Sequence, residues 1–251
     1  MAWTQRYDGA EPQRINKWLA QSGVCSRREA EALIAQGLVR IDGAVVADPG
    51  HKIAAGQTLA VADTGDAPIS VVIHKPVGVV SAQPERGQIP AARLLTTANL
   101  WGDDAPIPET TRSLPPLGRL DRDSRGLLIL SEDGVLAKAL IGPESGLDKE
   151  YEVRVSGAVT EKKLRLLRHG LHLDGRELKP AQVTHEGDNA LRFILHEGRN
   201  RQIRRMCEAV DLAVADLFRV RIGPLKLGDL PESKWRALAV DERASLIGAQ
   251  R

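Results

Sequence analysis

GRLDRDSRGLLIL, residues 118–130, joins a charged turn to a continuous apolar run. The apolar part, residues 127–130, is typical of a short strand buried on both faces of a sheet. Two carboxylates, Asp121 and Asp123, stand among three arginines directly before it. Because nearby positive charge favours the ionised form of a carboxylate, we expect an ionised acid at the mouth of a sheet. On these residues alone, a solvated turn with local ion pairs remains the alternative.

Two segments around this stretch predict further strands. Residues 70–74, SVVIH, form an apolar run that ends at Lys75-Pro76, for which we expect a structural role. Residues 149–155, KEYEVRV, alternate between charged and apolar side chains, which places Tyr151 on the buried side of a strand. A buried tyrosine is ordinarily core filling with one hydrogen bond.

Residues 198–208, GRNRQIRRMCE, predict a basic helix that Asn200 caps. Its buried stripe contains Ile203 and Met206, and Arg201, Arg204 and Arg205 occupy the other face. Arginines four residues apart repel each other, so an anion outside the helix is expected to compensate. Phosphate and the Asp121 carboxylate are the two candidates.

The N-terminal part predicts a small domain of two helices and a sheet. We interpret residues 1–13 as a flexible N-terminus. A helix follows from Arg14, a second begins at the capping box Ser26-Arg27-Arg28-Glu29, and Asp42-Gly43 is typical of a hairpin turn. The cations Arg14, Lys17, Arg27 and Arg28 crowd the two helices, as expected for contacts to phosphate; a solvated basic face is the alternative.

The remaining boundaries follow from composition. Residues 62–69 have the breaker content of a linker, residues 70–240 form the second domain, and residues 241–251 are a C-terminal tail. The loop of residues 96–113 contains Asp103-Asp104, which with Asp121 and Asp123 suggests a metal site; we expect none, because no further ligand follows at a useful spacing.

Length and charge bound the class of protein. With 251 residues and 42% hydrophobic side chains, the chain can bury a sizeable core. A net charge of +2 means that affinity for an anionic partner must come from clustered cations. Cys25 and Cys207 fit neither a disulfide framework nor a metal site, and no apolar run is long enough to span a membrane. We expect a cytoplasmic protein.

Residues 118–128 resemble the catalytic segment of the pseudouridine synthases of the RsuA/RluB/RluE/RluF family. Lys149-Glu150-Tyr151 and Gln202-Ile203-Arg204 are similar to the second and third motifs of that family, and the tail of the third is most similar to the RluF branch. His74 departs from the asparagine that often precedes Lys75-Pro76. The resemblance continues in residues 217–225, 228–231 and 234–238. Residues 14–61 resemble the S4-type (alpha-L) RNA-binding module.

The resemblance implies an α+β fold: an αα-β RNA-binding domain, then a synthase domain whose mixed, mainly antiparallel sheet is flanked by helices and loops. It implies an isomerase with no metal or cofactor. Asp121 would be the nucleophile, Tyr151 would stack on the target base, and Arg204 would pair with Asp121. The residues expected to contact RNA, or to support the site, are Arg119, Lys149, Arg201, Arg205, Arg14, Lys17, Arg27 and Arg28.

The implied substrate is a uridine in a loop or bulge of structured ribosomal RNA, since an unpaired base is the least costly to expose. The RluF-like tail favours large-subunit RNA; small-subunit RNA and transfer RNA are alternatives. A non-catalytic RNA-binding ribosome-assembly protein and a metal-dependent nuclease are the rival classes. We expect a monomer. The sequence does not choose between free RNA and an assembled subunit as the substrate.

Overall fold

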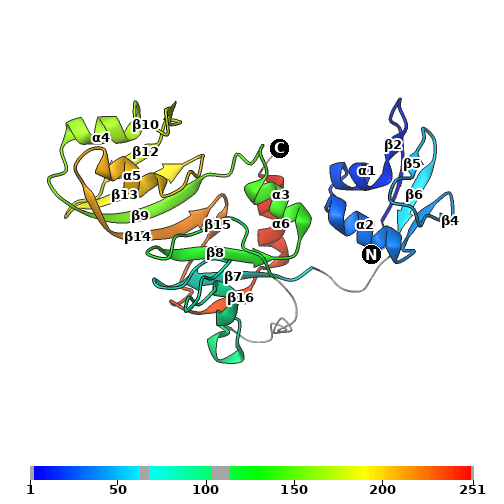
Figure 1. Cartoon of the computed structure of the whole chain (residues 1–251), viewed down its shortest axis with the longest axis horizontal. Coiled ribbons are helices and arrows are strands. Elements are labelled where there is room, and N and C mark those ends of the chain that lie inside the picture. The colour runs from blue at the N-terminus through cyan, green and yellow to red at the C-terminus, as the bar shows by residue number, and fades with distance from the viewer. Residues whose placement is uncertain (1–2, 63–67, 103–113, 250–251) are drawn as a thin grey trace. The chain divides into compact units, whose positions relative to one another are not determined.

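The computed structural model describes residues 3–62, 68–102 and 114–249. The chain divides into two compact units, residues 1–69 with 132–138 and residues 70–131 with 139–251 (Figure 1). Five residues of the expected linker, 63–67, and the Asp103-Asp104 pair lie outside the described residues. Both units combine helices and strands, so the α+β class is confirmed. No helix of the described ranges has the length and apolar character needed to cross a membrane.

Residues 3–62 of the first unit form two short helices, a four-stranded sheet and the two-stranded pair β2-β5. Helix α1 (Ile15–Gln21) precedes α2 (Arg27–Ala35), and the predicted capping box is present, since the Ser26 hydroxyl accepts the Glu29 amide at 3.2 Å. The sheet order is β1-β6-β3-β4. Asp42 and Gly43 both have positive φ, 49° and 86°, and turn β3 (Val39–Ile41) into β4 (Ala44–Val45) as predicted.

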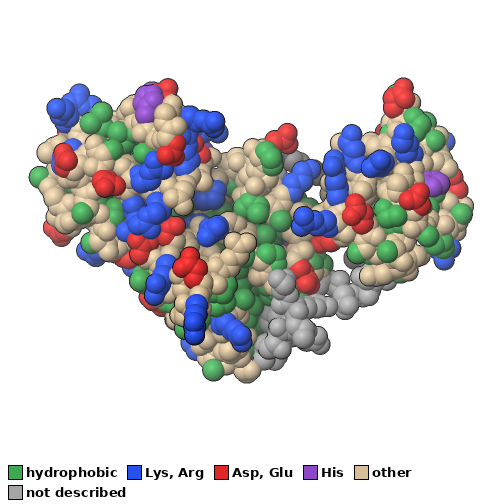
Figure 2. All heavy atoms as spheres, in the orientation of Figure 1, with side chains coloured by type: hydrophobic (Ala, Val, Ile, Leu, Met, Phe, Trp, Pro, Cys, Tyr) green, Lys and Arg blue, Asp and Glu red, His purple; other side chains and the backbone are tan. Residues whose placement is uncertain are grey.

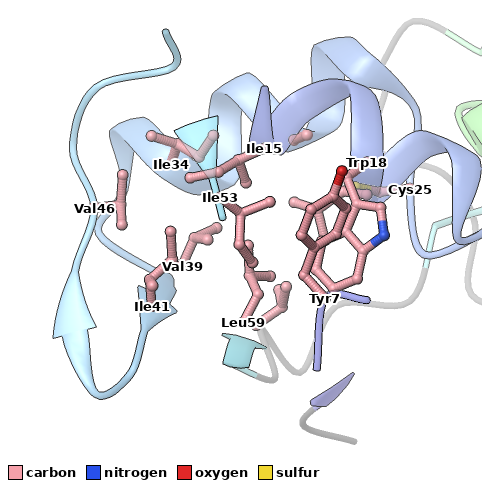
Figure 3. Close-up of a cluster of buried hydrophobic side chains, with 13 residues drawn as sticks. Tyr7, Ile15, Trp18, Cys25, Ile34, Val39, Ile41, Val46, Ile53 and Leu59 are labelled. Atoms are coloured by element: carbon pink, nitrogen blue, oxygen red, sulfur yellow. The ribbon is translucent and has the colours of Figure 1, made fainter. Parts of the chain in front are cut away.

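The core of the first unit lies between the helices and the strands (Figure 3). Ile15 and Ile34 of the helices pack with Ile53 of β5 (Lys52–Ile53) and Leu59 of β6 (Thr58–Val61), and all four are fully buried. Burial of each such side chain contributes about 1.5–3 kcal/mol relative to exposure. The unit therefore has a core of its own.

The N-terminal segment differs from the flexible N-terminus expected for residues 1–13. Residues Trp3–Arg6 form β1, antiparallel to β6, and residues Gln13–Arg14 form β2, antiparallel to β5. Tyr7 is buried, with its ring edge-on to Trp18 at a centroid distance of 5.2 Å. The expectation was wrong because an edge strand owes its order to backbone hydrogen bonds, which polar composition does not reveal.

The second unit is built on a mixed sheet with the order β12-β13-β9-β14-β8-β7-β16, in which β15 pairs with β14. Only the β14–β8 pair is parallel among the pairings of the described strands. The strands are β7 Ser70–Lys75, β8 Arg125–Ser131, β9 Lys149–Ser156, β12 Gln182–His185, β13 Ala190–Leu195, β14 Ala213–Ile222, β15 Leu225–Lys226 and β16 Trp235–Ala237.

The remaining elements of the chain are a hairpin, short 3-10 turns and helices. Their bounds are β10 His172–Leu173, β11 Arg176–Glu177, η1 Ala91–Leu94, η2 Thr97–Asn99, α3 Gly134–Ile141, α4 Glu161–Arg168, α5 Gln202–Glu208 and α6 Val240–Gly248. Helix α6 occupies most of the segment assigned to a C-terminal tail, and its Leu246 is fully buried. The tail is therefore part of the fold through Gly248.

Strand β8 lies inside the sheet, between β14 and β7, and its residues 127–130 are fully buried, as predicted. Gly126 faces Arg219 of β14 in the parallel pair, with φ +115°. A Cβ at this position would lie 2.3 Å from the Arg219 carbonyl oxygen, so only glycine permits this approach. The loop that carries Asp121 enters β8 at this end.

Candidate active site

A cavity of about 740 Å³ opens in the second unit beside the start of β8. Its wall contains the predicted Asp121, Tyr151 and Arg204, and with them Arg119, Lys149 and Arg201. Four separate segments supply these side chains: the loop before β8, strand β9, the turn after β13, and helix α5. The volume lies within the range of small-ligand pockets and accommodates a nucleotide.

The backbone around Asp121 is fixed on both sides, and its side chain is not. The Ser81 hydroxyl accepts the Leu120 amide at 2.9 Å and donates to the Leu120 carbonyl at 2.7 Å. The Gly78 amide donates to the Arg122 carbonyl at 2.8 Å. The Asp121 carboxylate remains 34% exposed. The arrangement presents a carboxylate on a rigid loop.

Lys75 holds the turn of residues 76–79, which is hydrogen-bonded to the Asp121 loop through Gly78. It is fully buried, and its Nζ donates to the carbonyls of Pro76 and Val79 at 2.8 and 2.7 Å. Burial lowers the pKa of Lys75 to about 8, although the charges of Asp121 and Asp123 act in the opposite direction. These contacts fit the structural role expected for Lys75, because the turn that it closes contains Gly78.

The arginines at α5 have different ion-pair partners from those expected. Arg204 forms no ion pair with Asp121 within the described chain; its Nη2 donates to the Asp123 carbonyl at 2.6 Å, and its Nε lies 3.3 Å from the Asp123 carboxylate. Arg201 Nη1 is instead 3.6 Å from Asp121. The expected pairing of Arg204 with Asp121 is thus absent from this structure, and Arg201 takes that place.

The start of α5 explains the position of Arg201. Asn200 was expected to cap the helix, but the cap residue is Arg201, in the left-handed conformation (φ 49°, ψ 34°) and without a side-chain cap. The Gln202 side chain accepts the Arg199 amide at 2.9 Å instead. Arg205, four residues after Arg201, pairs at two points with Asp174. The anions that bind these two arginines are therefore Asp123 and Asp174, whereas phosphate and Asp121 were the candidates expected; Asp121 has only the longer contact of 3.6 Å.

Tyr151 points inward from β9, as the alternation predicts, and is 9% exposed. It lies opposite Phe193 of β13 and Arg219 of β14. Lys149 lines the same cavity and donates to the Leu147 carbonyl at 3.3 Å. Burial lowers the pKa of Lys149, and the positive charge of Arg219 adds to the effect. The cavity thus offers a flat phenol ring beside several cations.

The sequence reasoning missed Arg219. This arginine is 1% exposed, lines the cavity, and donates to the carbonyls of Leu127 at 2.8 Å and Arg119 at 3.3 Å. Its guanidinium therefore joins the two ends of the Asp121 loop. The one available signal was its phase on β14, since it stands two residues after the buried Leu217.

The other predicted RNA contacts lie outside the cavity. Arg205 is not part of its wall. Arg14, Lys17, Arg27 and Arg28 belong to the first unit, and all four are exposed. Figure 2 shows lysine and arginine side chains gathered over α1 and α2. Among the described residues, no group of three or more His, Cys, Asp or Glu side chains is arranged to hold a metal ion.

Comparison with known proteins identifies the family of the chain. The family model for RNA pseudouridylate synthase matches residues 69–209, and the model for the S4 domain matches residues 13–59. The chain therefore belongs to the RNA pseudouridylate synthase family. It is an isomerase that acts on RNA, and it carries an N-terminal S4 domain.

Several relatives cover nearly the whole chain. An uncharacterized RNA pseudouridine synthase of Aquifex aeolicus is 37% identical over 94% of both chains. The dual-specificity RNA pseudouridine synthase RluF of Escherichia coli K12 is 33% identical, over 93% of this chain and 78% of its own. Ribosomal large subunit pseudouridine synthase B of Bacillus subtilis is 33% identical over 92% and 93%. A crystal structure of a pseudouridylate synthase aligns with a TM-score of 0.65 at 25% identity, covering 93% and 99%.

Proposed function

We propose that this synthase converts a specific uridine of ribosomal RNA to pseudouridine, with large-subunit RNA as the favoured target and Asp121 as the nucleophile. The observation that carries the proposal is the Asp121 carboxylate, 34% exposed on a fixed loop, at the wall of a cavity lined by arginines. The relatives named RluF and ribosomal large subunit synthase B support the choice of RNA.

The reaction itself sets the demands on the site. The bond from ribose C1′ to uracil N1 must break and a bond from C1′ to C5 must form, with no external reactant. A side-chain nucleophile divides this rearrangement into easier steps. Attack of Asp121 on C1′, attack on C6, and abstraction of a ribose proton all remain compatible with its position. Arg201 Nη1 lies 3.6 Å from the Asp121 carboxylate and places a positive charge beside the group that each of these routes uses.

The remaining cavity residues would hold the target nucleotide. Tyr151 offers a flat, rigid face on which the uracil ring stacks. Arg119 is exposed at the wall of the cavity and stabilises the displaced nucleotide. Extruding the base costs a few kcal/mol, least in a loop or bulge, so an irregular RNA segment is the preferred substrate.

In this proposal, residues 14–61 hold the RNA and residues 70–240 perform the chemistry. Arg14, Lys17, Arg27 and Arg28 supply the phosphate contacts of the first domain, which give affinity without reading the sequence. Arg205 becomes a contact only if RNA displaces Asp174 from it. No step of the proposed reaction uses a metal ion or an organic cofactor.

Replacement of Asp121 tests the chemistry. In Asp121→Asn, pseudouridine formation on ribosomal RNA should fall below detection while RNA affinity stays unchanged, because the amide is not a nucleophile but occupies the same volume. Asp229→Asn, at an exposed site, is the control and should remain fully active. A fully active Asp121→Asn would refute the assignment. Affinity without turnover in the unaltered enzyme would support the non-catalytic alternative.

A deletion of the gene tests the target. Pseudouridine mapping across ribosomal and transfer RNA should show one or a few positions lost in the deletion strain and restored by the wild-type gene. Loss in large-subunit RNA supports the favoured target. Loss confined to small-subunit or transfer RNA would replace it by the corresponding alternative.

A further inference from the structure

Arg201 lies between two carboxylates and binds them unequally. Its Nη1 and Nη2 are 3.0 and 2.9 Å from the two carboxylate oxygens of Asp123, in a two-point ion pair. The same Nη1 is 3.6 Å from the Asp121 carboxylate, beyond hydrogen-bond distance. The two outer nitrogens of Arg201 are therefore both committed to Asp123, and Asp121 has only the longer contact.

Asp123 is itself held in place. Arg204, whose side chain is 14% exposed, approaches the Asp123 carboxylate with Nε at 3.3 Å and donates from Nη2 to the Asp123 carbonyl at 2.6 Å. The hydrogen bond from Arg201 and the charge of Arg204 keep the pKa of Asp123 below its usual range. Asp123 thus remains ionised, in a fixed position, between two guanidinium groups.

The ion pairs of Arg201 fix the orientation of its guanidinium more than they stabilise the fold. The side chains of Arg201, Asp123 and Asp121 are 43%, 45% and 34% exposed. Ion pairs as exposed as these contribute little to folding. A guanidinium that binds a carboxylate at two points does, however, engage a lone pair on each oxygen. Each oxygen keeps a second lone pair, but the two N–H donors withdraw electron density from both oxygens and cover that edge of the carboxylate, which lowers its reactivity as a nucleophile.

We propose that Asp123 is a positioning residue of the isomerisation, which binds Arg201 at two points and so prevents Arg201 from closing onto the nucleophile Asp121. The positive charge of Arg201 then stays near Asp121, at 3.6 Å, without a hydrogen bond to its oxygens. The proposal rests on the proposed function, in which Asp121 is the nucleophile. The proposal is that the Asp121 and Asp123 carboxylates compete for the Arg201 guanidinium.

A purely structural role for Asp123 predicts a different result. If Asp123 only holds α5 against the Asp121 loop, the loss of Asp123 or of Arg201 breaks the same ion pair. The variant that lacks both should then be no faster than the variant that lacks Asp123 alone. If Asp123 holds Arg201 away from Asp121, the loss of Asp123 is harmful because Arg201 is present. Removing Arg201 as well should then restore part of the activity. The sign of the coupling separates the two roles.

The experiment is single-turnover kinetics on ribosomal RNA with enzyme in excess. In Asp123→Asn the maximal rate should fall about tenfold or more, while the half-saturating enzyme concentration changes less than about twofold. In Asp123→Asn with Arg201→Gln, the maximal rate should recover at least about threefold relative to Asp123→Asn alone. Asp174→Asn is the matched control, since it removes the two-point partner of Arg205 on the same helix, and should keep the wild-type maximal rate.

A second pair of variants leaves Asp123 intact. Lysine cannot bind a carboxylate at two points but retains the charge, so Arg201→Lys is free to approach Asp121 and should be slower than Arg201→Gln. The proposal is overturned if Asp123→Asn keeps the wild-type maximal rate, if the double variant is no faster than Asp123→Asn, or if Arg201→Lys is the faster of the second pair. In each case an inactive Asp121→Asn would leave the proposed function standing.

Discussion

Gly126 lies where β8 and β14 approach each other closely. A Cβ here would lie 2.3 Å from the Arg219 carbonyl oxygen and 2.7 Å from its amide nitrogen, and φ is +115°. We therefore expect Gly126→Ala to lower the free energy of unfolding by about 3 kcal/mol, the sum of overpacking and backbone strain. Urea unfolding measures it. Gly146→Ala, where no atom lies within 4 Å, should change stability by less than about 0.5 kcal/mol. Equal losses would contradict the argument.

His74 gives the fold a dependence on pH. It is buried and stacked on Phe218 at 5.2 Å, and its Nδ1 lies 2.9 Å from the Leu230 carbonyl. Burial lowers the pKa of His74 from the ordinary value of 6.5; the hydrogen bond to the Leu230 carbonyl and the charge of Glu232 oppose this, and Arg125 adds to it. Below pH 6.5 the unfolded chain therefore binds more protons at this residue than the folded chain does. Stability must fall as the pH is lowered through this range.

Replacement of His74 by asparagine isolates that effect, because the amide can still donate to the Leu230 carbonyl but does not titrate. Between pH 7 and pH 5 the unfolding free energy of the wild type should fall more steeply than that of His74→Asn. Urea unfolding at several pH values is the measurement. Parallel curves for the two proteins would show that His74 is not the group responsible.

For single residues, the sequence predicted which side chains lie at the cavity better than it predicted their ion-pair partners. The resemblance named Asp121, Tyr151 and Arg204, and the structure brings all three to one cavity. The partner of Arg204 was not predictable, because two carboxylates two residues apart compete for the arginines of α5. Arg219 escaped notice because alternating arginines in a strand are typical of an exposed face, whereas the guanidinium of Arg219 is buried among backbone carbonyls.

Among the elements, strands β9, β13 and β14 share a network of ion pairs centred on Glu150. The Glu150 carboxylate accepts from Arg221 of β14 at 2.6 Å and from Arg192 of β13. Its side chain is 15% exposed, and although burial alone would raise the pKa of Glu150, the two arginines bring it below its usual value. Glu152 lies two residues further along β9, is 47% exposed, and reaches Arg192 only at 3.4 Å.

These two glutamates make a matched pair of variants. Glu150→Gln should lower the unfolding free energy by about 1–3 kcal/mol, because it leaves two half-buried guanidinium groups without their shared anion. Glu152→Gln should cost less than about 0.5 kcal/mol, as exposed pairs do. Denaturant unfolding at low salt compares them. A larger effect at Glu152 would mean that the network does not tie these strands together.

The sequence predicted those helices and strands that have a distinct side-chain pattern, and it missed those that are held mainly by backbone pairing. Strand β8, strand β9 and the capping box of α2 were predicted, because each announces itself by side-chain pattern. Strand β1 was missed, since three of its four residues are exposed and its order comes from backbone pairing with β6. Helix α6 was missed because it has one buried residue, Leu246, and no apolar stripe to recognise.

At the scale of the whole molecule, the charges are divided by task. Within the described residues, Arg14, Lys17, Arg27 and Arg28 form no ion pair, whereas Arg201 and Arg205 are each bound by an aspartate. A net charge of +2 provides no general attraction to RNA, so local clusters must supply it. These four cations are therefore free to bind phosphate at no cost in broken ion pairs.

This division predicts a separation of binding from chemistry. Lys17→Gln and Arg28→Gln should raise the KM for RNA and leave the rate at saturating RNA unchanged. For each phosphate that the variant no longer neutralises, the slope of log affinity against log salt should become shallower by about 0.7–0.9. Arg40→Gln, which removes the same charge from strand β3, should leave both KM and slope unchanged. If Lys17→Gln and Arg28→Gln instead lowered the rate at saturation, the cations of the first unit would act on the chemical step rather than on affinity.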